Sequence, residues 1–262
     1  MISIITITYN AGQFLERTIQ SIAGQENATL GIDYEYLVVD GASTDDTLAL
    51  IRQYESNVSR WLSEPDWGLY DAMNKGLQLA SGEYVWFMNA GDELHDAQVL
   101  TRLLGQVRSP ELPDGVPPTD VYYSDALFVR EDGSPVGLRS QVTPHTLPTG
   151  GVSDALRWQD MALGMKVSHQ AFVVRRAIAP IYPINNLSAD LDWEIRCLKA
   201  SQHTQYLPFV LCRYLVGGLS KQKHRQSLID RFLVLTWHFG FWPTVWNHVR
   251  IVWRAGRGRA QA

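Results

Sequence analysis

Short apolar runs alternate with segments of helical periodicity through the first third of the chain. The runs occupy residues 2–8, 34–39, 61–62 and 84–88. They are rich in β-branched and aromatic residues, which favour buried strands. Between them apolar residues recur at helical spacing, as Phe14, Leu15 and Ile19 do. Strands that alternate with helices predict a parallel, doubly wound α/β sheet, and the polar strand ends should cluster at one edge.

The pattern is less regular in the remainder. We expect strands at 121–129, 168–176 and 205–216, helices at 97–108 and 189–200, a hairpin turn at 131–134 and a long loop at 137–164. We predict one α/β domain at 1–220, a mixed sheet flanked by helices. Residues 221–262 are predicted to form a basic, aromatic helical appendage, in which Pro243 separates two helices.

Aromatic and basic residues are interleaved in this appendage, between residues 227 and 254. Such a composition suits helices that lie in a membrane interface, with rings at headgroup depth and cations near anionic lipid. The alternatives are that the aromatic residues pack on the domain or form a dimer interface, since packing is the commoner role of large apolar side chains.

Composition describes an ordinary globular protein of 262 residues, 45% hydrophobic and 19% charged. The net charge of −4 is uneven: the segment from Lys221 carries eight Lys or Arg and one acid, a net +7, which leaves −11 for the rest. This balance argues against a nucleic-acid binder. Cys197 and Cys212 lack metal-site spacing and indicate a reduced cytosolic protein. We see no basic leader and no run of roughly 18 apolar residues, so we expect a cytoplasmic protein, either free or peripheral on the inner face of the membrane.

Asp92 and Glu93 follow the buried run at 84–88 through a turn of small residues. In an open α/β sheet, ligands bind outside the carboxyl ends of the strands. A divalent cation that bridges a diphosphate needs one or two carboxylates there. Asp92 is therefore a candidate metal ligand; the alternative is that it caps the next helix.

Thr8, Tyr9, Asn10 and Asp40 lie where the first two predicted strands end. An aromatic face and a carboxylate there can hold a base and a ribose, although Asp40 also suits a helix-initiating turn. Neither a G-x-G-x-x-G motif nor a P-loop follows the first strand, which disfavours a nicotinamide dehydrogenase and a P-loop kinase. Without a glycine cradle a diphosphate needs another positive charge, which a metal on Asp92 would supply.

Five motifs in one order carry a family resemblance: T-Y-N at 8–10, V-D-G-A-S-T-D-D-T at 39–47, E-P-D-x-G-x-Y-D-A-M-N-K-G at 64–76, A-x-G-E-Y at 80–84 and N-A-G-D at 89–92. The chain resembles the family 2 glycosyltransferases with a GT-A fold, and most of all the bacterial branch that builds colanic acid and similar surface polysaccharides. The resemblance implies a Rossmann-like mixed sheet and Mn²⁺ or Mg²⁺ as cofactor. It also implies inverting transfer of a sugar from a UDP- or GDP-linked donor to a lipid-linked saccharide.

The resemblance further implies which residues form the site. The nucleotide-sugar contacts fall on Thr8, Tyr9, Asn10, Asp40, Asp66, Tyr70, Asp71, Lys75, Asn89 and His169. Residues 89–92 stand at the place of the family's D-x-D motif but offer one acid, Asp92. Glu93 or a later histidine, with His224 as the candidate, would complete the metal sphere.

Inverting transfer needs a base that takes the proton of the acceptor hydroxyl, and a carboxylate suits this role. The segment S-A-D-L-D-W at 188–193 resembles the family's E-D-x-x-W/L motif, in which the Asp is that base. Asp190 aligns with it, Ala189 replaces the preceding acid, and Asp192 is the fallback. Asp190 also suits the N-cap of the following helix, and both roles can hold together.

Two other functions remain open. A chain with a substituted D-x-D motif and with Ala189 could be a non-catalytic nucleotide-sugar binding protein, which donor hydrolysis with Mn²⁺ would distinguish. A sugar nucleotidyltransferase shares the βαβ architecture. It needs a Gly-rich loop with Arg or Lys after the first strand, however, and residues 9–12 lack one.

Overall fold

The computed structural model describes residues 1–108, 117–142, 155–217 and 224–259, with side chains in the last range from 225 to 250. The strands are β1 (Ile2–Thr8), β2 (Tyr34–Asp40), β3 (Arg60–Ser63), β4 (Tyr84–Phe87), β5 (Glu93–Leu94), β6 (Val121–Tyr123), β7 (Ala126–Val129), β8 (Pro135–Leu138), β9 (Phe172–Arg175), β10 (Thr204–Tyr206) and β11 (Cys212–Leu215). The helices are α1 (Gly12–Ala23), α2 (Thr47–Gln53), α3 (Leu69–Leu79), α4 (Val99–Val107), α5 (Arg139–Val142), α6 (Ala189–Ala200), α8 (His224–Phe239) and α9 (Phe241–Arg259). Short 3₁₀ helices are η1 (Glu55–Asn57), η2 (Trp158–Leu163), η3 (His169–Ala171) and η4 (Arg176–Ile178).

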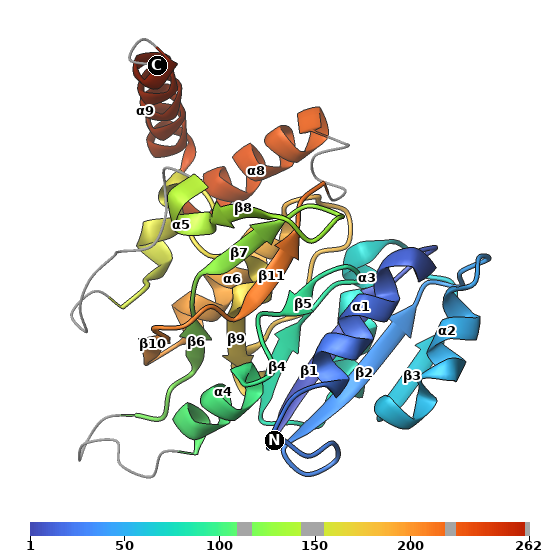
Figure 1. The fold of residues 1–262 in the computed structure, drawn as a ribbon. Coiled ribbons are helices and arrows are strands. Elements are labelled where there is room, and N and C mark those ends of the chain that lie inside the picture. The colour runs from blue at the N-terminus through green and yellow to red at the C-terminus, as the bar shows by residue number, and fades with distance from the viewer. Residues whose placement is uncertain (109–116, 143–154, 218–223, 260–262) are drawn as a thin grey trace.

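The large sheet is mixed, as predicted. Among the described residues its strand order is β10-β6-β9-β4-β1-β2-β3, and Figure 1 shows β1 and β4 near its centre. Strands β1 to β4 run parallel, whereas β9 is antiparallel to both β4 and β6. The parallel part comes from the first 90 residues, where strands and helices alternate.

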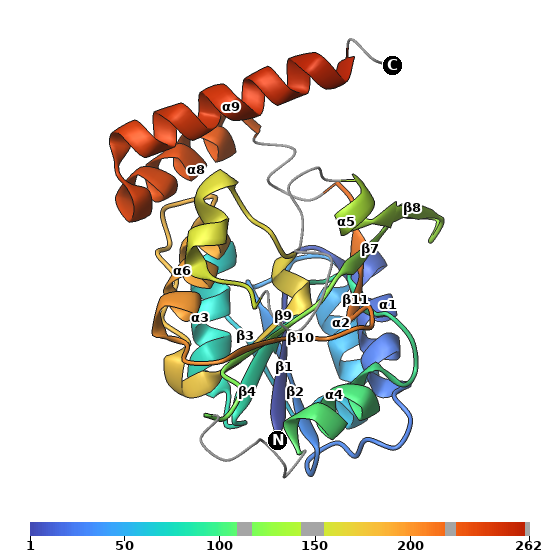
Figure 2. The ribbon, with the colours of Figure 1, turned by 90° about the vertical axis from the view of Figure 1, so that its left-hand side faces the viewer.

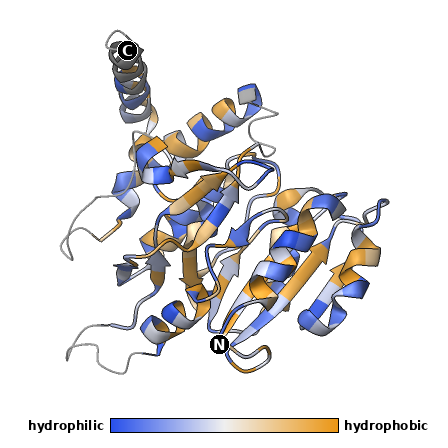
Figure 3. Cartoon of the chain, in the orientation of Figure 1, coloured by the Kyte–Doolittle hydropathy of each residue, from blue (hydrophilic) through white to orange (hydrophobic). Residues whose placement is uncertain are grey.

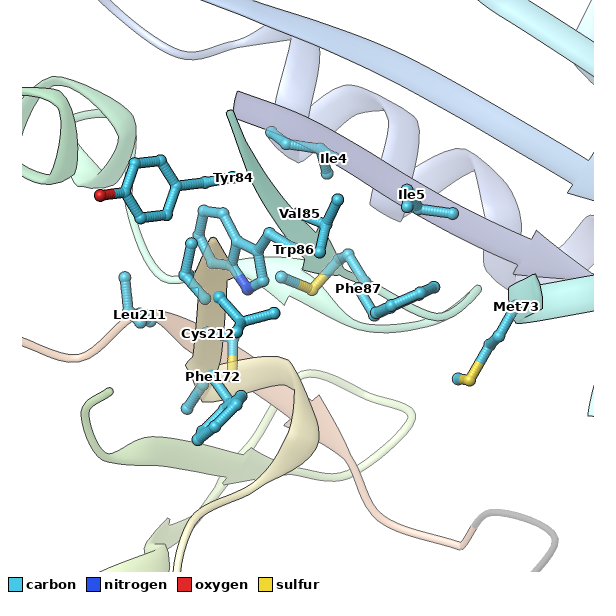
Figure 4. Packing of buried hydrophobic residues seen from close by; sticks show 14 of the residues in the cluster. Ile4, Ile5, Met73, Tyr84, Val85, Trp86, Phe87, Phe172, Leu211 and Cys212 are labelled. Carbon is cyan, nitrogen blue, oxygen red and sulfur yellow. The ribbon is translucent and has the colours of Figure 1, made fainter. Parts of the chain in front are cut away.

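Helices cover both faces of this sheet. Figure 2 shows α3 and α6 on one face and α1, α2 and α4 on the other. Every residue of β1 and β2 is buried, which explains why apolar residues dominate both strands. Their polar residues find partners, as where Ser3 Oγ donates to Glu35 Oε1 at 2.6 Å. Trp86, Phe87 and Phe172 pack at the centre (Figure 4), and each is at most 1% exposed. Figure 3 shows the same concentration of hydrophobic residues along the strands.

Two segments that we predicted as single strands each divide between two sheets. Residues 121–129 form β6 in the large sheet and β7 in a small sheet of order β5-β11-β7-β8, and residues 205–216 divide into β10 and β11. Ser124 interrupts the first segment, and its hydroxyl accepts a hydrogen bond from Leu211 N. Pro208, which has no N–H to donate, interrupts the second.

Helices α8 and α9 form the C-terminal appendage, at the end of the molecule opposite the N-terminus (Figures 1 and 2). The break between them lies at Gly240, with φ of +88°, and not at Pro243 as predicted. Pro243 occupies the first turn of α9, where proline is tolerated. One face of the pair packs on the domain, since Leu235 is buried and Phe239 stacks on Trp158 at 5.4 Å. In the ranges that the structure describes, no helix has the length and apolar character needed to cross a membrane.

Candidate active site

The parallel strands end at one edge of the sheet, on the side of the molecule where α8 and α9 lie (Figure 2). Thr8, Asp40 and Ser63 are the last residues of β1, β2 and β3 and are register partners, so they form a row. The turn at 89–92 lies beside this row, because Ala90 N donates to Ile7 O at 3.3 Å. The expected clustering of the strand ends is therefore confirmed.

The turn at 89–92 is held by α1 and requires a glycine. Thr18 Oγ1 accepts from Gly91 N at 2.9 Å and donates to Asp92 O at 2.7 Å. Gly91 has φ of +102°, and a Cβ there would lie 2.8 Å from Leu215 Cδ2. An acid at position 91 would therefore be strained and crowded.

Asp92 is almost fully buried, with 4% of its surface exposed. Its Oδ1 accepts from Leu215 N at 2.8 Å, and the Gln170 side chain also bonds to the carboxyl group. Burial raises the pKa of Asp92 to about 7, and these hydrogen bonds offset the effect only in part. Glu93, which we considered as a second metal ligand, instead lies 3.5 Å from Arg213.

Two buried oxygen atoms at this edge have no hydrogen-bond partner in the described part of the protein. They are Thr8 Oγ1, at the end of β1, and Asn89 Oδ1, just after β4. Buried polar atoms are nearly always paired, so these two atoms call for a ligand or water. Both residues belong to the predicted nucleotide-sugar contacts.

Tyr9 and Asp66 meet over Gly41. A Cβ on Gly41 would overlap the Asp66 carboxylate and would lie 3.3 Å from Tyr9 Cδ2. Tyr9 is 63% exposed, and Trp67, next to Asp66, is 84% exposed. An exposed ring beside a carboxylate suits a nucleobase, which stacks on the ring and donates hydrogen bonds from its edge. Sequence reasoning selected Tyr9 and Asp66 but missed Gly41, whose missing side chain makes room for them.

Asp40 orders the loop after β2. Its carboxylate has no exposed surface and accepts hydrogen bonds from Ser43 N, Ser43 Oγ and Ser63 Oγ. Asn10 is tied to the same loop, since its Oδ1 accepts from Thr44 N at 2.8 Å. The direct ribose contact predicted for Asp40 is not favoured by this arrangement, which matches the turn role that the sequence left open.

Lys75, a predicted site residue on α3, is paired with two neighbouring acids. Lys75 Nζ lies 2.9 Å from Glu64 Oε1 and 3.6 Å from Asp71 Oδ2. It also donates to the Pro65 carbonyl, and Asp71 accepts from Trp67 N. Because two carboxylates neutralise Lys75, it offers a diphosphate little net positive charge.

Asp190 lies in the first turn of α6 and is half-buried. Its Oδ1 accepts from Leu191 N at 2.8 Å, and the Tyr70 hydroxyl also bonds to the carboxyl group. Burial raises the pKa of Asp190 above its ordinary value, which suits a base that must take a proton near neutral pH. Tyr70, predicted to contact the nucleotide, is only 5% exposed and instead contacts Asp190.

Tyr214, on β11, brings the candidate base and the candidate metal ligand together. Burial raises the pKa of Tyr214 to about 12, and the negative charges of Asp92 and Asp190 add to the shift. Both carboxyl groups therefore lie close enough to Tyr214 to act on it, although they come from opposite halves of the chain. Transfer between a donor and an acceptor requires such convergence of their binding groups.

Asp192 points away from this site. Its Oδ1 lies 2.7 Å from His238 Nε2 of α8, and its Oδ2 lies 3.2 Å from Arg196. Residues four apart share a helix face, whereas residues two apart do not. Asp192 therefore attaches the appendage, and the geometry favours Asp190 as the base.

His169 lies inside an aromatic cluster. Its Nε2 is 2.7 Å from the Tyr182 hydroxyl, and its ring lies 5.2 Å from that of Phe87 and 5.3 Å from that of Trp193. Burial lowers the pKa of His169 to about 3, so the ring is neutral. With 5% of its surface exposed, it is not placed to contact a nucleotide sugar. The side chain of His224 lies outside the described residues.

Sequence reasoning missed two charged residues near Asp190. Glu194 is fully buried one helical turn further along α6, and neither of its carboxyl oxygens has a hydrogen-bond partner in the described part of the chain. Burial and the nearby Asp190 raise the pKa of Glu194 well above its ordinary value, while Arg139 acts in the opposite direction. The i, i+4 spacing from Asp190 was visible in the sequence. Nothing in the sequence marked Arg139, which lies in a predicted loop.

The edge offers limited means to hold a metal. The described part of the chain contains no group of three or more His, Cys, Asp or Glu side chains arranged for an ion. The turn at 89–92 does supply Asp92 and the unpaired Asn89 Oδ1. Mg²⁺ takes most of its ligands from phosphates and water, and needs only one or two protein oxygens. These residues therefore fit an ion that arrives with a diphosphate.

Comparison with known proteins identifies the family. The model of glycosyl transferase family 2 matches residues 3–171, and this chain belongs to that family. A PGL/p-HBAD biosynthesis glycosyltransferase of Mycobacterium tuberculosis (strain ATCC 25177 / H37Ra) is 33% identical over 245 residues, which cover 90% of this chain and 85% of that protein. The protein is thus a glycosyltransferase.

Two solved structures share the fold. Staphylococcus aureus (S. aureus) TarS 1–349 in complex with UDP-GlcNAc has a TM-score of 0.64 at 17% identity, and the match covers 89% of this chain but only 64% of that one. The mannosyltransferase PcManGT of Pyrobaculum calidifontis, in complex with GDP-Man and Mn²⁺, has a TM-score of 0.62 at 16% identity and covers 100% of this chain and 80% of that one. These matches confirm the expected GT-A type of fold.

Proposed function

We propose that this protein is an inverting glycosyltransferase that moves a sugar from a nucleotide diphosphate sugar to a lipid-linked saccharide in surface polysaccharide synthesis. The observation that carries the proposal is the edge where the parallel strands end, at which the turn that bears Asp92 lies beside the row of strand ends and Thr8 Oγ1 and Asn89 Oδ1 lack partners among the described residues. TarS and PcManGT support the donor class, because their structures hold UDP-GlcNAc and GDP-Man. We place the reaction in the cytoplasm, where the free thiols of Cys197 and Cys212 stay reduced.

In the proposed reaction the acceptor hydroxyl attacks the anomeric carbon of the donor sugar. A bond forms between that oxygen and the carbon while the bond from the carbon to the diphosphate oxygen breaks. The nucleoside diphosphate leaves with the electron pair, and Asp190 takes the hydroxyl proton. Attack from the side opposite the leaving group inverts the anomeric centre.

The donor is proposed to lie along the strand ends. Tyr9 and Asp66 hold the base, and Thr8 and Asn89 use their unpaired oxygens toward the ribose and diphosphate. A Mn²⁺ or Mg²⁺ ion held by Asp92 and Asn89 would neutralise charge on the leaving diphosphate. Burial raises the pKa of Asp92 because the ionised carboxylate is disfavoured there, and a bound divalent cation would supply the positive charge that favours the ionised form.

The test separates binding from chemistry. UDP-, GDP- and dTDP-sugars are screened for thermal stabilisation of the protein with and without Mn²⁺. Asp92→Asn should abolish the Mn²⁺-dependent part. Asp190→Asn should keep donor binding and lower kcat by about 10²-fold or more, the usual scale for loss of a general base. Asp192→Asn, on the same helix, is the control; a larger kcat loss there would transfer the role of base to Asp192.

A second candidate is a non-catalytic nucleotide-sugar binding protein. The substituted D-x-D motif at 89–92 and the pairing of Lys75 with two carboxylates favour it. Donor hydrolysis with Mn²⁺ by the wild-type protein, absent in Asp190→Asn, would rule it out. Stabilisation by a donor without any hydrolysis or transfer would support it.

A further inference from the structure

The appendage exposes large apolar side chains along one face of each helix. On α8 they recur at i, i+4 and i+8, and on α9 at i, i+4 and i+7. We name this set the C-terminal stripe: Ile229 (55% exposed), Leu233 (55%), Trp237 (84%), Trp242 (77%), Trp246 (65%) and Val249 (54%). Exposed apolar surface of this extent on a folded protein marks an interaction site.

The stripe is held in place by residues on other faces of the same helices. His238 bonds to Asp192 at 2.7 Å, and Asp230 accepts from Leu187 N at 2.7 Å. Asn247 of α9 donates to the Ala162 carbonyl at 3.2 Å. The appendage therefore does both things that the sequence left open. One face packs on the domain, and another remains exposed for a membrane or a second copy.

The charge of the appendage indicates what covers the stripe. Helix α9 contains four arginines and no acid, and residues 221–262 carry a net +7. Arg250 follows the stripe directly, and together with Lys166 it lines a cavity of about 360 Å³ between η2 and α9. A symmetric contact with a second copy would bring these like charges together, which costs free energy. Tryptophan rings with flanking arginines instead match an anionic membrane interface.

We propose that the C-terminal stripe docks this protein on an anionic phospholipid surface. The tryptophan rings enter the headgroup region, and Arg250, next to the stripe, meets lipid phosphate. Since the parallel strands end on the side of the molecule where α8 and α9 lie, docking brings the candidate active site near the membrane (Figure 2). The docking surface stands on its own observations; its use in reaching a lipid-linked acceptor rests on the proposed function.

The test is sedimentation of the full chain with vesicles of phosphatidylglycerol and phosphatidylcholine, compared with phosphatidylcholine alone. The wild type should sediment with the anionic vesicles at low salt and be released as salt rises. Replacing Trp237, Trp242 and Trp246 together by Ala should weaken the partition about tenfold or more. Ile32→Ala is the control, because Ile32 is 70% exposed but lies in the loop before β2.

Thermal unfolding checks that each variant is folded, and the mixtures contain no donor sugar, so failure here leaves the proposed transferase untouched. The proposal is overturned if the wild type stays in the supernatant at low salt, or if the triple variant binds as the wild type does. Sedimentation velocity tests whether a second copy of the protein covers the stripe instead. If the wild type dimerises, fails to bind vesicles, and becomes monomeric on loss of the three tryptophans, the stripe belongs to a second copy.

Discussion

Glu194 gives the folded state a pH dependence with a definite sign. Its pKa is raised well above the ordinary 4.5, mainly by burial, so the folded state keeps a proton that the unfolded state releases. The contribution of Glu194 to the free energy of unfolding is then complete below about pH 4.5 and is lost as pH rises through the folded pKa. Arg139 offsets part of this effect without cancelling it.

Glu194→Gln should therefore flatten the pH dependence of stability. Gln cannot ionise, so the free energy of unfolding of the variant loses a pH slope of up to about 1.4 kcal/mol per pH unit. An unpaired buried amide also lowers its stability, but by the same amount at every pH. The measurement is the midpoint of urea unfolding from about pH 5 to about pH 8. Glu131→Gln, at an exposed turn, is the control. Parallel curves for wild type and Glu194→Gln would show that Glu194 is ionised in the folded state.

At the scale of elements, strands and helices were predicted best where the local sequence pattern alone determines their bounds. The bounds of β1 and α6 agree with the structure to the residue, because their runs are continuous and end at turn or cap residues. Residues 121–129 and 205–216 were predicted wrongly as single strands, because strand propensity does not say which sheet a segment joins. The site shows the same limit: Asp92 and Asp190 follow from strand and helix ends, whereas Tyr214 enters only through tertiary contacts.

The attachment of α8 to α6 depends on Asp192. Burial raises the pKa of Asp192, but hydrogen bonds from His238 and Arg196 outweigh it and hold the pKa below its ordinary 3.8. This stabilisation is complete above that ordinary value and is lost as pH falls through the folded pKa. Asp192→Asn should cost about 1–3 kcal/mol near neutral pH, because charged hydrogen bonds are lost.

Hydrogen exchange of the α8 amides is the specific readout for Asp192→Asn. Exchange there should become faster, while the amides of β1 and β4, in the centre of the sheet, keep their protection. Asp190→Asn is the matched variant on the same helix and should leave α8 unchanged, because Asp190 contacts Tyr70 and not His238. Equal effects of the two substitutions on α8 would contradict the division of roles between the two acids.

At the scale of the whole molecule, the question is whether residues 221–262 are a separate unit, as the division at 220 predicts. Val234 and Leu235 of α8 are buried, and Phe239 covers Trp158.

Ending the chain at Gln226 would remove these contacts and free Asp192 from His238. Losing two buried side chains at roughly 1.5–3 kcal/mol each should lower the unfolding temperature by about 6–12 °C or more. The triple tryptophan variant removes only exposed rings and should unfold near the wild-type temperature. If the truncated chain instead unfolds at the wild-type temperature, the appendage is an independent unit and the packing face of α8 contributes nothing to the domain.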